Sequence, residues 1–116
     1  MTIPLEIMLR GNDRVFTETL TLAGEPGTWN ERDIGTLLKN MLVAIDRVQN
    51  PGKTAVPDVS LRGLSWIVHP SDKGVVIALE IHSASAVAGP LNLTAAHLDN
   101  LITRALRAAA PTPVIH

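Results

Sequence analysis

The residues best suited to acid–base chemistry are a glutamate and a histidine near the end of a predicted strand. Glu80 and His82 are two positions apart, which places them on one face of that strand, and Ser65 would lie opposite Glu80 on the neighbouring strand. A carboxylate beside an imidazole can transfer protons if a pocket covers the pair. Because no third catalytic group can be placed beside them, a solvated sheet face is the preferred interpretation. Glu80, His82 and Ser65 are the candidates for a polar or ligand-binding site.

The histidines do not predict a metal site. His69 and His82 lie on strands that would pair, but a turn near Asp72 separates them by roughly 20 Å at ~3.3 Å per residue. The chain has no cysteine, and a zinc site needs three or four converging ligands. We therefore expect no metal and no cofactor. The alternative is a two-fold axis that brings Glu80 and His82 of two copies together, but the apolar pattern places such an axis nearer the turn.

Three short matches to functional motifs fail on their context. Residues 51–54, Pro-Gly-Lys-Thr, resemble the end of a phosphate-binding loop, but they follow a predicted helix, and Arg47 stands where that motif needs a glycine. Residues 63–67 lack the final glycine of a nucleophile elbow and lie within a predicted strand. Residues 92–94 form a glycosylation sequon, which is better explained by Thr94 capping a helix.

The elements that would position these residues follow one pattern twice. Residues 3–50 predict strand, strand, helix, and residues 59–110 predict the same series again. Turn residues at 11–13 and 70–74 separate the strands of each pair. The prediction is a single α+β domain over residues 1–116, with ββαββα order, an antiparallel sheet, two helices packed on one face and a tail at 111–116.

The two helices are predicted at 29–49 and 95–109. Apolar residues from Ile34 to Val48 recur every three or four positions, which gives one broad stripe for a sheet to cover. Thr28 and Glu31 match a capping box at the start, and Pro51 stops the helix by residue 49. Thr94 is the predicted cap of the second helix.

One strand is apolar on both sides, which suggests that both faces of the sheet are covered. In residues 74–81, apolar residues occupy nearly every position. Met8, Ile67, Val76 and Ala78 would then point away from the helices. A sheet with one face in water normally alternates polar and apolar residues, so we interpret these four residues as an interface with a symmetric partner. The alternative is that residues 83–90 fold over this face as a loop.

Composition excludes several classes of function. Net charge is −1, charged residues make up 18% and aromatic residues 3%, so the chain lacks both the basic surface and the stacking residues of nucleic-acid binders. Neither helix is basic enough to favour a membrane surface, and no apolar run approaches the ~20 residues that span a bilayer. The first 20 residues contain five charges and do not predict a secretion signal, so the expected location is cytoplasmic.

These observations favour a small non-enzymatic protein-binding module of the adaptor, chaperone or regulatory type, acting as a homodimer. One alternative is a small enzyme or ligand-binding domain with its pocket at the dimer seam, using Glu80 and His82. Another is a subunit of a larger hetero-assembly.

Overall fold

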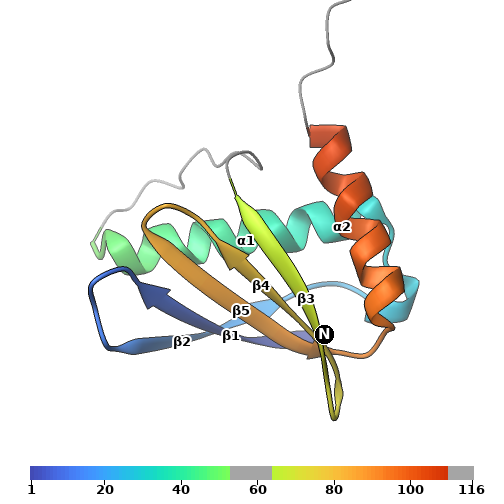
Figure 1. Cartoon of the computed structure of the whole chain (residues 1–116), viewed down its shortest axis with the longest axis horizontal. Helices are drawn as coiled ribbons and strands as arrows, with labels where there is room; N and C mark the ends of the chain where they lie inside the picture. The colour runs from blue at the N-terminus through green and yellow to red at the C-terminus, as the bar shows by residue number, and fades with distance from the viewer. Residues whose placement is uncertain (53–63, 110–116) are drawn as a thin grey trace, which may run out of the picture.

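A computed structural model describes residues 1–52 and 64–109, which form one antiparallel sheet and two helices (Figure 1). In chain order the elements are β1 (Thr2–Leu9), β2 (Val15–Thr21), a 3-10 turn (Pro26–Thr28), α1 (Glu31–Gln49), β3 (Ser65–Ser71), β4 (Gly74–Glu80), β5 (Ala84–Leu91) and α2 (Ala95–Ala109). The predicted α+β class is confirmed. The part of the third strand predicted at residues 59–63 lies outside the described residues.

The sheet has the strand order β2-β1-β5-β4-β3, and every neighbouring pair is antiparallel. The sequence pattern did not predict β5. This strand lies at the centre of the sheet and joins the two halves of the chain. The alternative that residues 83–90 form a loop over the second face is therefore wrong, because Ala84–Leu91 pairs with β1 on one side and β4 on the other. Strand β2 lies at one edge of the sheet and β3 at the other.

The β3–β4 hairpin turns at Asp72 and Lys73, in the region where the sequence predicts a turn. In its register Trp66 is opposite Leu79 and Val68 is opposite Ile77, so these side chains share one face. At the turn, Gly74 has a φ of 139° and approaches β5 so closely that an added Cβ would lie 2.2 Å from the Leu91 carbonyl oxygen. Only glycine fits this position without a shift of the backbone.

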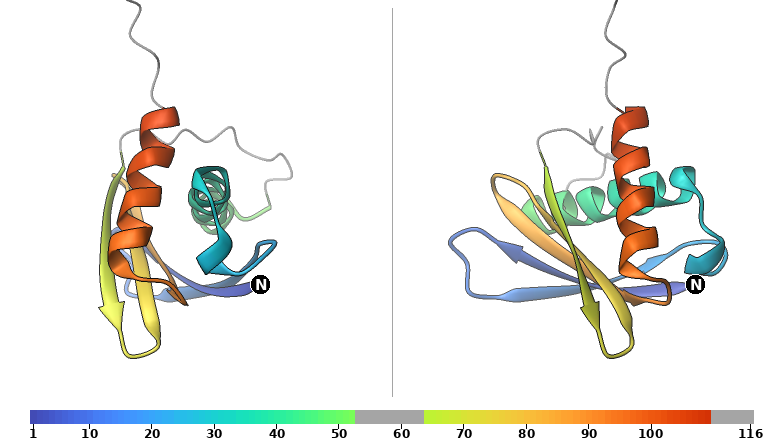
Figure 2. Two further views of the ribbon diagram at one scale, coloured as in Figure 1. Left: turned by 90° about the vertical axis from the view of Figure 1, so that its right-hand side faces the viewer. Right: turned by 45° about the vertical axis from the view of Figure 1, so that its right-hand side comes forward.

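Both helices cover the same face of the sheet (Figure 2). The core-facing residues of the three central strands are fully or almost fully buried: Ile3, Leu5, Ile7, Val75, Ile77, Leu79, Ala84, Ala86 and Ala88. From α1 the buried set contains Ile34, Leu37, Leu38, Met41, Leu42, Ala44 and Ile45. From α2 it contains Leu98, Leu101, Ile102 and Ala105. The alternation of period two on the strands thus meets the stripes of period three and four on the helices.

The start of α1 differs from the prediction. Asn30, not Thr28, is the N-cap, and its side chain accepts a hydrogen bond from the Asp33 N–H at 3.0 Å. The Asp33 carboxylate accepts one from the Asn30 N–H at 2.9 Å, which completes the capping box. Thr28 belongs to the preceding 3-10 turn, where its hydroxyl donates to the Glu25 carbonyl. The helix end at Gln49 and the Thr94 cap of α2, which accepts from the His97 N–H, are both confirmed.

Candidate functional site

No described element covers the face of the sheet opposite the helices. We call it the open face, and we define it by the outward-pointing strand residues Thr2, Pro4, Glu6, Met8, Val15, Thr17, Thr19, Thr21, Ser65, Ile67, His69, Val76, Ala78, Glu80, Ser85 and Val87. On edge strand β2 this face carries three threonines beside Val15, and on edge strand β3 it carries Ser65 and His69 beside Ile67.

Large exposed apolar side chains gather on this face. Among the described residues, those with substantial exposure are Met8 at 52%, Val15 at 51%, Ile67 at 65% and Val87 at 38%. All four belong to the open face, and each comes from a different strand. Scattered single apolar residues are normal on a protein surface, whereas a cluster on one face is typical of an interaction surface.

The pairing register places the apolar residues in two adjacent rows across all five strands. One row runs Val15, Met8, Ser85, Glu80, Ser65, and the next runs Thr17, Glu6, Val87, Ala78, Ile67. The apolar members therefore form a diagonal stripe from the β2 edge to the β3 edge. Glu6 and Glu80 flank the stripe on opposite sides, so the charge that the rows contribute is negative.

The four residues predicted as an interface, Met8, Ile67, Val76 and Ala78, all lie on the open face. Met8 and Ile67 are well exposed, while Val76 and Ala78 on β4 are half-buried between neighbouring strands. At Val76 the ladder contains a bulge, because the β4–β5 register shifts between Val75 and Ile77. Sequence reasoning found neither Val15, at the start of β2, nor Val87, which lies on the strand that the pattern lacked.

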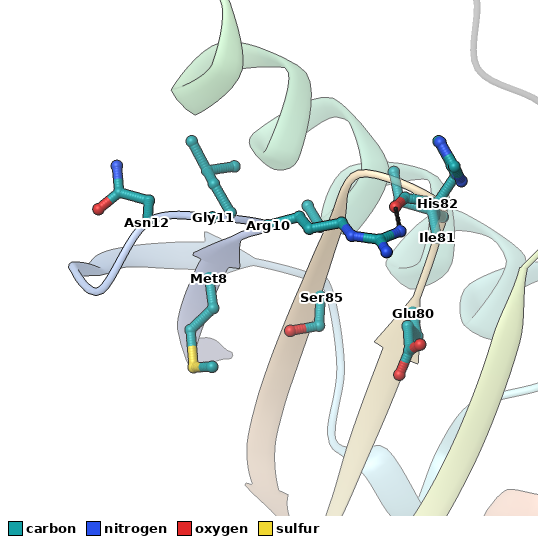
Figure 3. Close-up of a pocket in the computed structure, with 10 residues that line it drawn as sticks. Met8, Arg10, Gly11, Asn12, Glu80, Ile81, His82 and Ser85 are labelled. Carbon is teal, nitrogen blue, oxygen red and sulfur yellow. Dashed lines mark hydrogen bonds between the residues drawn. The ribbon is translucent and has the colours of Figure 1, made fainter.

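A hollow of about 480 Å³ opens at one end of the open face, where β1 ends and β4 turns into β5 (Figure 3). We call it the Glu80–Arg10 hollow. Met8, Glu80 and Ser85 line it from the open face, and Arg10, Asn12 and His82 line it from the loops at the end of the sheet. Leu9, Ile81 and Ala84 add apolar wall.

The three predicted polar-site residues are only partly brought together. Ser65 lies opposite Glu80 in the β3–β4 ladder, as predicted. His82 is not on the strand, because β4 ends at Glu80 and His82 belongs to the turn before β5. Its ring points away from the Glu80 carboxylate (Figure 3). Glu80 and His82 therefore line the same hollow without forming an acid–base pair, and Ser65 does not line it.

Sequence reasoning missed Arg10. Its backbone N–H donates to the Ser83 carbonyl at 2.9 Å, and its guanidinium extends to the His82 carbonyl at 3.4 Å (Figure 3). The second distance is long for a hydrogen bond, so the guanidinium is only loosely held. Arg10 and Glu80 are 70 residues apart, and the β1–β5 pairing brings them to one hollow; no local sequence signal connects them.

A second hollow of about 560 Å³ lies on the other side of this end of the sheet, against the C-terminus of α1. Arg10 and His82 border both hollows. In the second hollow the Gln49 amide donates to the Ser83 hydroxyl at 2.7 Å, which ties α1 to the β4–β5 turn. Cations are favoured near a helix C-terminus, so the position of Arg10 also complements the dipole of α1.

Neither a metal centre nor a membrane span is found in the described part of the chain. Within residues 1–52 and 64–109, no three His, Asp or Glu side chains are close enough to hold a metal ion. No helix in these ranges is both long and apolar enough to cross a membrane.

Comparison with known proteins adds no relative. No family model matches the chain, and no curated protein or solved structure matches it either. The open face and the Glu80–Arg10 hollow are therefore the two features from which a function can be inferred.

Proposed function

We propose that this protein is a non-enzymatic binding module that acts as a homodimer, with the open faces of two copies packed against each other. The observation that carries this proposal is the gathering of Met8, Val15, Ile67 and Val87 on one face of the sheet. Burying apolar surface is the dominant favourable contribution to association, and these side chains are the ones with most apolar surface still to bury.

The open face is of a suitable size for a dimer. Four strand spacings of ~4.8 Å give a width of about 19 Å, and strands of about seven residues at ~3.3 Å give a length of about 23 Å. The projected area is then on the order of 450 Å², and the accessible area of protruding side chains is larger. A standard stable interface buries about 800 Å² per partner, so the whole face would have to take part.

A second copy is the favoured occupant because the face can be complementary to itself. In a two-fold dimer the same patch serves both subunits, and face-to-face sheets normally pack with interdigitating side chains about 10 Å apart. Val87 is near the middle of the face, on the central strand, so an axis through it would bring the two stripes into contact. Glu6 and Glu80 lie to either side of the stripe and would come close to the partner subunit, so the cost of desolvating their charges opposes association.

The non-enzymatic role is supported by the arrangement of Glu80 and His82. A general acid and a general base that act together must both lie within hydrogen-bonding reach of the protons they transfer, whereas the Glu80 and His82 side chains point apart (Figure 3). A binding role needs no such pair. It needs exposed apolar area, which the open face has.

The mass of the protein in solution tests this proposal. Light scattering of the full chain should give about twice the 12.4 kDa of one copy at micromolar concentrations. A wild-type protein that stays monomeric at millimolar concentration would refute the homodimer. The alternative would then be that this protein is a subunit of a hetero-assembly, in which a different protein covers the open face.

A second candidate function is binding of a small ligand, and the Glu80–Arg10 hollow is the observation that favours it. The hollow has a volume in the range of small-molecule sites, and it combines apolar wall with a few polar groups. This function is compatible with the first, because the hollow opens at one end of the open face.

A further inference from the structure

We propose that the Glu80–Arg10 hollow binds a small zwitterion, with the ligand's carboxylate at the Arg10 guanidinium and its ammonium group at the Glu80 carboxylate. The hollow carries one full charge of each sign, and the two are not joined. Within the described residues the ion pair that forms is Arg47 with Glu18, at 3.4 Å. Arg10 and Glu80 therefore line one hollow, and among the described residues neither has a charged partner.

The opposite charges select against simpler ions. An anion held by Arg10 would be repelled by Glu80, and a cation held by Glu80 would be repelled by Arg10. A molecule that carries both charges satisfies each wall at once. Charge-assisted hydrogen bonds are about twice as strong as neutral ones, so two of them give such a ligand a clear preference.

Arg10 keeps most of its hydrogen-bonding capacity free for this role. A guanidinium has five N–H donors in a planar fork that matches a carboxylate. One donor reaches the His82 carbonyl, and only at 3.4 Å. The Ser85 hydroxyl and the Asn12 amide line the same hollow and can complete the ligand's hydrogen bonds.

The apolar residues that line the hollow determine which kind of side chain the ligand should carry. Met8 is 52% exposed and Ile81 is partly buried, so both present apolar surface to the hollow. This favours an α-amino acid with an apolar side chain over glycine or a purely polar zwitterion. Methionine adapts to ligands of varied shape, which predicts modest discrimination among such side chains.

The proposed dimer would close the hollow, and this part of the inference rests on the proposed function. Met8, Glu80 and Ser85 belong to the open face, so a second copy packed there would cover the hollow on that side. The end lined by Arg10, Asn12 and His82 would stay open for entry. Exclusion of water strengthens both ionic contacts.

Titration with L-leucine, followed by the amide shifts of labelled full-length protein, tests the inference. Saturable shifts are expected at Gly11, Ile81 and Ser85, with Gly35 on α1 unaffected, and the dissociation constant should be about millimolar, as suits an open site. Leucine stripped of one charge, as isopentylamine or 4-methylpentanoate, should bind about tenfold more weakly or not at all.

Matched variants assign the two contacts. Arg10→Met and Glu80→Gln should each weaken leucine binding about tenfold. Arg104→Met and Glu31→Gln make the same changes at exposed positions away from the hollow and should leave it unaltered. Absence of saturable shifts would overturn the proposal, as would equal binding of the one-charge analogues or equal loss in the control variants.

Failure of the ligand site and failure of the dimer give different results. Ile67 lies on the open face but does not line the hollow, so Ile67→Lys should separate the subunits and weaken leucine binding by removing the cover. A dimer that does not bind leucine refutes the ligand site alone. A wild-type monomer that binds leucine refutes the dimer and its closure of the hollow.

Discussion

Ile67→Lys is the change that bears most directly on self-association. Ile67 is the most exposed large apolar side chain among the described residues, at 65%, and it lies on edge strand β3 opposite Ala78. A lysine here can extend into water in a single copy, so the monomer should keep its stability within about 0.5 kcal/mol. In the dimer the same lysine would stand in the apolar stripe. Val76 is a poorer position, since it is half-buried at a bulge.

The expected loss of affinity follows from the exposed fraction. Full burial of an isoleucine side chain contributes about 1.5–3 kcal/mol, so the 65% that is still exposed in one copy corresponds to about 1–2 kcal/mol. Two copies contribute to each dimer, which makes about 2–4 kcal/mol. At about 1.4 kcal/mol per tenfold, the dissociation constant should rise between about thirtyfold and several hundredfold. Desolvation of the lysine adds to this loss.

Sedimentation equilibrium over a range of concentrations measures both dissociation constants, and circular dichroism checks that the variant is folded. Thr36→Lys is the matched control, because it adds the same charge at an exposed position on α1, on the far side of the molecule from the open face. The reasoning is refuted if folded Ile67→Lys dimerises as tightly as the wild type. It is equally refuted if Thr36→Lys loses as much affinity.

Three further outcomes are expected. Glu6→Gln should tighten self-association several-fold in sedimentation experiments, because it removes a charge beside the apolar stripe that forms no ion pair with any described residue, and weaker association would contradict this. In urea unfolding, Gly74→Ala should lower the unfolding free energy by about 2 kcal/mol or more. Gly11 has a φ of 80° but open space around it, so Gly11→Ala should lower the same quantity by about 1 kcal/mol. Equal losses would show that the close approach of Gly74 to β5 is unimportant. Asn30→Ala should lower the unfolding free energy by about 1 kcal/mol, and Thr28→Ala should lower it by less. A larger loss for Thr28→Ala would instead support the capping box of Thr28 and Glu31 that the sequence predicts.

Sequence patterns predicted the elements whose apolar periodicity is long and uninterrupted. The α1 stripe has seven buried residues over three turns, and Asp72-Lys73 stands between two β-branched runs, so both the helix and the hairpin could be recognised. The capping box at α1 was misassigned because both Thr28 with Glu31 and Asn30 with Asp33 have the required spacing. What decides between them is the 3-10 turn at Pro26–Thr28, which delays the start of the helix.

The central strand β5 was missed for a physical reason. Its sequence, Ala-Ser-Ala-Val-Ala-Gly-Pro-Leu, has one β-branched residue and contains the glycine and proline that usually mark a loop. Its alternation is present in Ala84, Ala86 and Ala88, which are buried under α1. Alanine favours a helix over a strand, so the hydrogen bonds that the neighbouring strands supply on both sides make this segment extended.

The error in β5 also explains what was missed at the candidate site. Without a strand that pairs with both β1 and β4, the two ββα halves have no defined contact, and Arg10 cannot be placed near Glu80. The pairs Met8 with Ser85 and Glu80 with Ser85 establish that contact. The interface residues were easier to predict. Whether a strand residue points toward the helices or away from them follows from the alternation along its own strand, without knowledge of its neighbouring strands.

The edges of the sheet favour association through the open face over strand-to-strand addition. On edge strand β3, Pro70 has no N–H to offer a further strand. On edge strand β2, Glu18 points toward the core side and pairs with Arg47 of α1, so a strand added there would lie against a charged pair. Both are recognised ways of keeping exposed edges from pairing with other chains. Within the described residues the apolar stripe has no comparable protection along its length, and this supports the proposal that the sheet associates face to face.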